Sequence, residues 1–195
     1  MKRKIGIAFM ASGLVLLVTA AALLFYNNFE NKRAEDTAEV IVDSLMGEIE
    51  VNRLEEIETD PFDTEMKVAE IDGYGYIGYL YIPALNLELP VMDKWDYNRL
   101  KISPCRYYGS TKTDNLVIAA HNYRSHFKYL GQLKPDDTVM FADIEGNKHT
   151  YRVSAIETLK PTDVEKVKDT GDDLILYTCT YSGNNRIIVR CFKTA

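Results

Sequence analysis

Hydrophobic and polar positions divide this chain into three parts, and the first is a continuous apolar stretch. Residues 5–26 carry no charged side chain over 22 positions, and they follow the basic sequence Lys2-Arg3-Lys4. A helix of that length rises about 33 Å, enough to cross a hydrocarbon layer of about 30 Å. The apolar region of a cleavable signal peptide is shorter, about 7–15 residues. The pattern predicts an uncleaved, single-pass transmembrane signal-anchor over residues 1–27, with the basic end in the cytoplasm and everything after it outside.

The second part, residues 28–70, is charged and polar. Ile41, Leu45 and Ile49 recur every four residues, which predicts a short amphipathic helix. An acidic run follows, made of Glu55, Glu56, Glu58, Asp60, Asp63 and Glu65. These carboxylates could bind calcium, but the loop spacing of the known calcium motif is missing. The simpler prediction is a solvated linker that holds a domain away from the membrane.

The third part, residues 71–195, has the texture of β-structure. Apolar and aromatic runs such as LVIAA, DLILYTC and RIIVRCF are separated by turns rich in Gly, Asn and Asp. About six to eight short strands at this spacing predict a closed barrel or a sandwich. One segment, NYRSHFKYLGQLK at residues 122–134, interrupts the strands with a helical pattern.

Composition and charge change this picture little. The chain has 195 residues, which suits one domain plus attachments, and 46% of them are hydrophobic, enough to bury a core. The formal net charge is −6. Because no long basic block follows the N-terminus, the sequence argues against a nucleic-acid partner.

Three histidines are candidates for chemistry. His121 ends the apolar run LVIAA, and a titratable side chain at a strand end points into the cleft that the loops build. His126 follows five residues later and does not share a helix face with His121. His149 follows a Gly-Asn turn, where we expect an edge position with no role. A zinc site from His121, His126 and a cysteine is an alternative, but the closely spaced ligand pairs of structural zinc sites are missing.

The three cysteines differ in their surroundings. A small, odd number fits at least one free thiol better than a disulfide framework. Cys179 ends the run DLILYTC close to a turn, where a nearby cation would lower the pKa of its thiol. Cys191 alternates with Ile187 and Val189, so we expect a small core side chain. Cys105 follows a proline in a predicted loop, and we expect no catalytic role for it.

Two arginines follow Cys179 along the chain. Arg186 comes directly after the sequence Gly-Asn-Asn and opens the next strand, so we expect it at the same end of the hairpin as Cys179. Arg190 lies four residues further, about 13 Å along the strand. Of the two, Arg186 is therefore the one that can serve a Cys179 thiolate.

These segments resemble the sortases, the cysteine transpeptidases of the Gram-positive cell surface. The resemblance rests on AAHNYRSHF with His121, on LYTC ending at Cys179, on NNRIIVR with Arg186, and on GYLYIPALNLELPV as a first strand. It covers about residues 71–195 and agrees with the N-terminal anchor. Two positions depart from the family pattern, because Ala120 stands where many members have glycine and Ile175 where threonine often opens the cysteine motif.

The resemblance implies an all-β fold, a closed eight-stranded sortase-like β-barrel with one or two short helices, preceded by the transmembrane helix. It implies cleavage of a C-terminal sorting motif of the Leu-Pro-x-Thr-Gly type in secreted proteins. The acyl group would pass to an amine of a cell wall precursor or to a pilin lysine. Cys179 would be the nucleophile, His121 the acid and base, and Arg186 the group that holds substrate and oxyanion.

The same resemblance implies no metal and no organic cofactor. Two other functions stay open at this point. One is a secreted cysteine peptidase with water as the acceptor, although papain-like enzymes place the cysteine before the histidine and on a helix. The other is a membrane-tethered binding module without chemistry, which would leave the pairing of Cys179 and Arg186 around the turn unexplained.

Overall fold

A computed structural model describes residues 2–54, 64–168 and 170–194 of the chain. The chain divides into two compact units, Met1–Arg33 and Ala34–Ala195. Residues 55–63, which hold most of the acidic run and its calcium alternative, lie outside the described residues.

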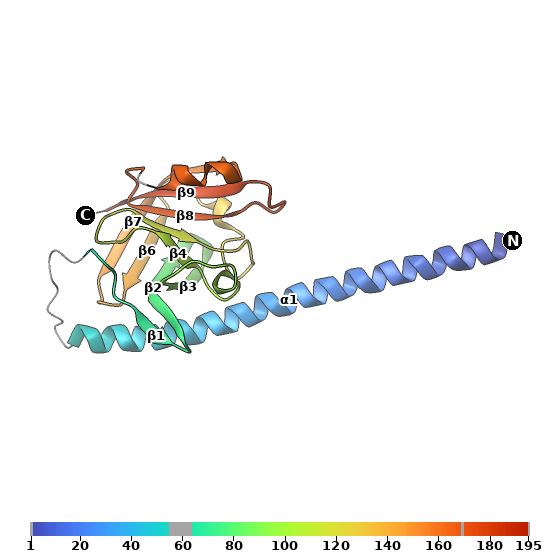
Figure 1. Cartoon of the computed structure of the whole chain (residues 1–195), viewed down its shortest axis with the longest axis horizontal. Helices are drawn as coiled ribbons and strands as arrows, with labels where there is room; N and C mark the ends of the chain where they lie inside the picture. Colours follow the sequence, from blue (N-terminus) through green and yellow to red (C-terminus); the bar gives the residue numbers. More distant parts are fainter. Residues whose placement is uncertain (1, 55–63, 169, 195) are drawn as a thin grey trace. The chain divides into compact units, whose positions relative to one another are not determined.

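The N-terminal unit is helical. Helix α1 (Lys2–Leu54) contains the whole apolar stretch, and its large side chains in this unit, such as Phe9, Leu24 and Phe25, are exposed. This part of the helix is long and apolar enough to cross a membrane. The apolar N-terminal helix that the sequence predicts is therefore confirmed (Figure 1).

The part of helix α1 that belongs to the second unit buries one face there. Ala34, Ala38, Ile41, Val42 and Leu45 follow helical spacing, and none is more than 7% exposed. A stripe of this kind stabilises a helix by packing against a core. The helix that the periodicity predicted around Ile41 is present, but the prediction of a solvated linker is wrong for this face. The segment forms part of the same unit as the strands.

Nine strands lie in the described residues, and eight of them close a barrel (Figure 1). The ring runs β2-β3-β4-β5-β8-β9-β7-β6 and returns to β2, while β1 pairs with β2. The strands are β1 (Ala69–Ile71), β2 (Tyr74–Ile82), β3 (Leu87–Met92), β4 (Cys105–Tyr108), β5 (Leu116–Ala119), β6 (Thr138–Asp143), β7 (Lys148–Leu159), β8 (Leu174–Cys179) and β9 (Arg186–Lys193). The closed eight-stranded barrel implied by the resemblance is confirmed, and a sandwich is excluded.

The connections carry four short 3₁₀ helices in the described residues: η1 (Pro83–Leu85), η2 (Arg99–Lys101), η3 (Leu130–Gln132) and η4 (Pro161–Val167). The predicted helical segment, residues 122–134, forms turns and η3 rather than an α-helix. Its buried apolar residues Phe127, Leu130 and Leu133 are three positions apart. That interval matches three residues per turn, which is the geometry of a 3₁₀ helix.

Strands β5 and β8 are buried on both faces, which explains their unbroken apolar runs. They are parallel neighbours, and such strands commonly lack an exposed side. One set of side chains fills the barrel interior: Leu116, Ile118, Leu174 and Leu176. The alternate set belongs to a second apolar cluster on the outer face: Val117, Ala119, Ile175 and Tyr177. Polar groups on these strands are therefore found where the strands end.

Candidate active site

The three predicted site residues lie at one end of three neighbouring strands. Strand β5 ends just before His121, β8 ends at Cys179, and β9 begins at Arg186. The order β5-β8-β9 makes β8 the middle strand. In the antiparallel pair of β8 and β9, Cys179 is directly opposite Arg186, which agrees with the expectation that both lie at the same end of the hairpin.

His121 follows the register of β5 against β8. Ala119 is paired with Tyr177, an offset of 58 residues, and the same offset joins Ala120 to Thr178. The next positions along the two chains are His121 and Cys179. Since neighbouring strands lie about 4.8 Å apart, the register brings the imidazole, thiol and guanidinium residues to one edge of the barrel.

A threonine fixes this edge. The buried Thr178 donates its hydroxyl hydrogen to the carbonyl oxygen of Ala120 at 2.8 Å, and the Ala120 amide donates to the Tyr177 carbonyl at 3.1 Å. These bonds join the residues that precede Cys179 and His121. The sequence shows Thr178 directly before Cys179, but it does not show which group the hydroxyl binds.

The three thiols have different surroundings. Cys179 is partly exposed at the end of β8, whereas Cys105 and Cys191 are fully buried. Burial raises the pKa of both buried thiols to about 12, so they stay protonated at neutral pH. The core position predicted for Cys191 is confirmed. Cys105 opens β4 rather than lying in a loop, so that part of the prediction is wrong.

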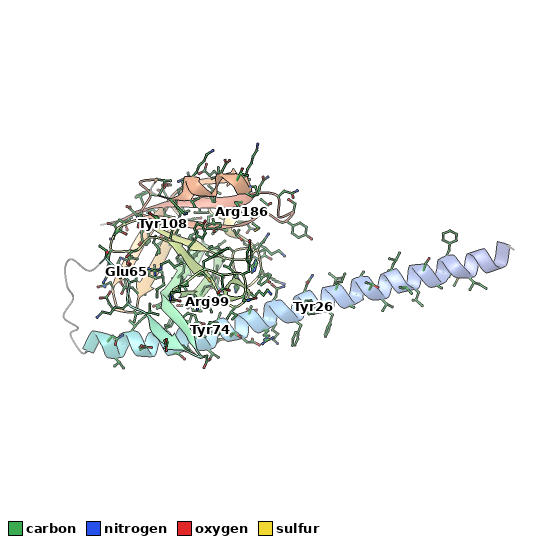
Figure 2. The ribbon with its side chains drawn as sticks, in the orientation of Figure 1. Tyr26, Glu65, Tyr74, Arg99, Tyr108 and Arg186 are labelled. Carbon is green, nitrogen blue, oxygen red and sulfur yellow. The ribbon has the colours of Figure 1, made fainter. Side chains whose placement is uncertain are left out.

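Arg186 lies at the turn of the β8–β9 hairpin (Figure 2). Its Nη1 donates to the carbonyl oxygens of Gly183 and Asn185, each at 3.1 Å. Gly183 adopts a positive φ of 73°, a conformation that glycine reaches without strain. The turn thus holds the guanidinium at the same end as Cys179.

Arg190 has a different environment. It is paired with Ile175, four positions along β9 from the pair of Cys179 and Arg186, as the sequence predicted. Its guanidinium binds the carboxylates of Glu157 and Asp172. Burial lowers the pKa of Arg190, but these two carboxylates outweigh burial and raise it overall. Arg190 is therefore a structural residue.

The imidazole of His121 is half-buried and packs against an aromatic ring. Its ring centroid is 4.8 Å from that of Tyr123, with the planes 28° apart. Burial lowers the pKa of His121, and the positive charge of Lys101 lowers it further. The neutral imidazole is favoured in the resting protein, as suits a group that accepts and returns a proton.

The other two histidines occupy separate positions. His126 is 1% exposed, and burial lowers its pKa to about 4. His149 lies in β7 opposite Phe141 of β6, and its Nε2 donates to Asp143 at 2.9 Å. The register of β7 with β9 begins at Tyr151, so His149 is paired on the β6 side alone. Among the described residues, no group of three or more histidine, cysteine or carboxylate side chains is placed to hold a metal ion.

An aromatic row lies on the outer face beside Cys179. Tyr177 precedes Cys179 by two residues and so shares its face of β8. Tyr107 of β4 reaches across β5 and meets Tyr177 edge-on, with ring centroids 5.3 Å apart. The small side chain of Ala119, opposite Tyr177, leaves room for this contact. Trp95 continues the row, with its ring 5.8 Å from that of Tyr107.

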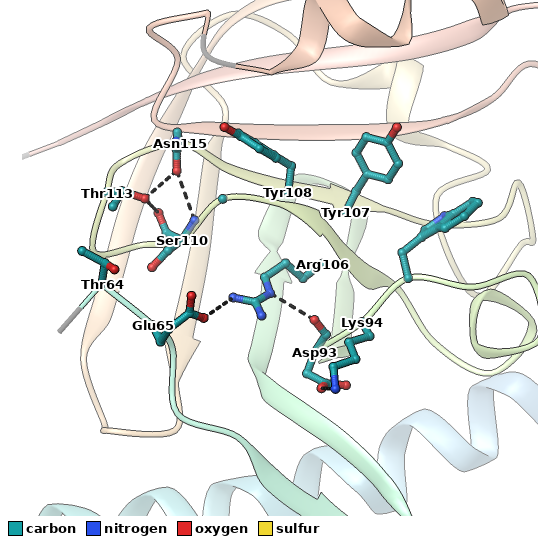
Figure 3. Close-up of a pocket in the computed structure, with 12 residues that line it drawn as sticks. Thr64, Glu65, Asp93, Lys94, Arg106, Tyr107, Tyr108, Ser110, Thr113 and Asn115 are labelled. Carbon is teal, nitrogen blue, oxygen red and sulfur yellow. Dashed lines mark hydrogen bonds and ion pairs between the residues drawn. The ribbon is translucent and has the colours of Figure 1, made fainter.

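A cleft of about 690 Å³ opens beside this row (Figure 3). Trp95 and Tyr107 form its aromatic side, and Glu65 and Arg106 belong to its polar side. The Nε of Arg106 donates to the carbonyl oxygen of Asp93 at 3.0 Å, and its Nη1 lies 3.8 Å from Glu65 Oε2. Aromatic and charged surfaces therefore meet within reach of the strand that carries Cys179.

Comparisons with known proteins agree with this arrangement. A family model described as Sortase domain matches residues 80–194. Sortase A of Bacillus anthracis is 24% identical over 185 residues, which cover 88% of this chain and 87% of that protein. The barrel of this chain also resembles those of solved structures. Sortase C of Streptococcus pneumoniae has a TM-score of 0.59 at 22% identity, with 80% of this chain and 96% of that chain covered. The sortase D5 transpeptidase of Clostridium perfringens has a TM-score of 0.61 at 14% identity, with 82% of this chain and 99% of that chain covered.

Proposed function

This chain belongs to the sortase family, and from that premise we propose that it is a membrane-anchored cysteine transpeptidase. It cleaves a sorting motif of the Leu-Pro-x-Thr-Gly type and transfers the acyl part to an amine. The observation that carries the proposal is the register that brings His121, Cys179 and Arg186 to one edge of three neighbouring strands.

In the first half of the reaction, neutral His121 takes the thiol proton of Cys179, and the resulting thiolate attacks the carbonyl carbon of the motif's threonine. The carbon–sulfur bond forms and the bond to the glycine nitrogen breaks, while protonated His121 gives its proton to the departing amine. In the second half, an incoming amine attacks the thioacyl carbon and His121 takes its proton. The Cys179 sulfur leaves as a thiolate and takes that proton from His121, so the thiol and the neutral imidazole return to their starting states.

Arg186 stabilises the negative oxygen that develops at the attacked carbonyl. Both of its bonds to the turn are made by Nη1, so Nε and Nη2 can donate to a substrate oxygen. Charged hydrogen bonds aimed at a developing oxyanion contribute several kcal/mol to catalysis in typical cases. The turn carbonyls orient the guanidinium before the substrate arrives.

The peptide lies in the cleft beside the aromatic row and reaches Cys179 at the end of β8. Continuity supports this path, because the aromatic row of Tyr177, Tyr107 and Trp95 leads from the Cys179 strand to the cleft of Figure 3. Aromatic side chains give a large contact area for the apolar residues of an extended peptide.

The apolar part of α1 anchors the protein in the cell membrane. Its length and composition support a single pass, and the basic residues before it favour a cytoplasmic N-terminus. The catalytic unit is then outside, where secreted proteins pass. The acceptor is an amine of a cell wall precursor or a pilin lysine; the structure of Streptococcus pneumoniae sortase C concerns pilin substrate specificity in that protein.

Mass spectrometry of a peptide library tests the proposal, using the chain from residue 28 with and without amine acceptors. We expect a cleaved peptide joined to the amine. Cys179→Ala should abolish both cleavage and transfer, whereas Cys191→Ala should keep the chemistry and cost about 1 kcal/mol of stability. Cleavage with water alone would favour a peptidase. Full activity of Cys179→Ala would end the proposal.

A further inference from the structure

Tyr123 contacts two histidines at once. Its ring stacks on His121 with centroids 4.8 Å apart and planes at 28°. It also lies 5.4 Å from the ring of His126, with the planes at 35°. The three rings belong to one short loop that follows β5, so a residue outside the reacting groups touches the proposed acid and base directly.

Hydrogen bonds fix the backbone of the loop that carries Tyr123. The carbonyl oxygen of Tyr123 accepts two amide hydrogens, from His126 at 3.0 Å and from Lys128 at 3.1 Å. The carbonyl oxygen of His121 accepts the amide of Phe127 at 3.2 Å. His126 and Phe127 are at most 1% exposed and fix the loop to the core. The backbone positions from which the rings of Tyr123 and His121 meet are therefore fixed.

We propose that Tyr123 is a positioning residue for His121. The ring of Tyr123 holds the plane of the imidazole and presents an aromatic face to its protonated form. The inference rests on the proposed function, in which His121 carries a proton between the two halves of the reaction. The negative face of an aromatic ring attracts a cation, so the stack favours the protonated imidazole over the neutral one.

The other groups around His121 act in different ways. Lys101 of η2 opposes its protonation, as does burial. His126, on the same loop, also interacts with His121, and it stays neutral above about pH 4. Cys179 of β8 and Arg186 of β9 lie at the neighbouring strand ends. Tyr123 is thus a group that favours the imidazolium ion without adding a charge that would disturb the substrate.

The test compares Tyr123→Leu with Tyr123→Phe in the chain from residue 28. Leucine fills similar space without an aromatic face, so the pKa of His121, followed by NMR, should fall by about half a unit. We expect kcat to fall about three- to tenfold while KM stays within twofold, because a residue that acts through His121 leaves substrate binding unchanged. Phenylalanine keeps the ring and should restore both values.

Tyr129→Leu is the matched control. Tyr129 lies in the same segment, is 36% exposed, and has its ring close to Lys128 rather than His121. It should leave the pKa of His121 and kcat unchanged. If Tyr123→Leu does not fold, Tyr123→Met is measured in its place.

A folded Tyr123→Leu protein with the parent's pKa and kcat would overturn the inference. A rise in the pKa would overturn it too, since the ring would then act by excluding water alone. The NMR titration does not need activity, so it separates this inference from the proposed function. Full activity of His121→Gln would refute the proposed function, while an unchanged His121 pKa in Tyr123→Leu would refute the inference alone.

Discussion

Replacing His126 by leucine should remove much of the acid sensitivity of the folded protein. The side chain is 1% exposed, and its pKa is lowered from 6.5 to about 4, first by burial and then by His121, while the backbone of Ile102 acts in the opposite direction. An imidazole in this position folds neutral. Leucine occupies similar space and carries no group that can take a proton.

The magnitude follows from the difference in pKa between the two states. The unfolded chain takes up a proton as the pH falls through 6.5, whereas the folded protein resists it until about pH 4. Stability from this residue is therefore constant above pH 6.5 and falls as the pH is lowered towards 4. At about 1.4 kcal/mol per pKa unit, the full loss is about 3 kcal/mol, of which about 2 kcal/mol is reached by pH 5.

Urea unfolding at pH 7.5 and pH 5.0 measures this loss in the chain from residue 28. The parent protein should lose about 2 kcal/mol more than His126→Leu between the two pH values. The carboxylates are the same in both proteins, so their titration cancels in the comparison. An equal loss in the two proteins would show that His126 is not the buried neutral group that its position indicates.

Three further predictions concern the site and its support. Arg186→Lys loses the planar guanidinium fork and should lower kcat/KM at least about tenfold on a fluorescent sorting-motif peptide. Arg190→Lys should leave kcat/KM close to the parent's and lower stability instead. Equal kinetic effects of the two variants would contradict the assignment of Arg186 to the site. Leu45→Ala should cost about 3 kcal/mol in urea unfolding and Met46→Ala, at an exposed position, little; equal values would contradict the packing of α1. Thr178→Val should cost about 1–2 kcal/mol and lower kcat, and unchanged kcat would mean that its bond to β5 does not align the site.

The barrel could be predicted in part from the alternation of residues. Runs such as those of β5 and β8 indicated strands, but periodicity alone left a barrel and a sandwich open. Strand closure depends on the pairing of β2 with β6, residues about 60 positions apart, which no local pattern encodes. The resemblance of four segments to the sortases supplied that closure.

The placement of Cys179 and Arg186 at one end of a hairpin could be predicted from the sequence, because both residues flank one turn. Contacts between segments that are distant along the chain could not be predicted. Tyr107 meets Tyr177 across Ala119, and Thr178 binds Ala120, so these pairs join strands that are separated along the chain by dozens of residues. The buried face of α1 was visible as a four-residue spacing, but its partner surface was not.

The location of the proposed chemistry follows from the burial of its strands. A thiol or imidazole in the middle of β5 or β8 would be buried on either face, because both faces are covered. Cys191 shows the result, since burial there raises the pKa of the thiol to about 12 and removes it as a nucleophile. A thiol can be partly exposed only where the buried part of the strand ends. Cys179 and His121 lie there, one residue beyond Thr178 and Ala120. The strand ends supply that position, and the bond between those two residues holds the ends together.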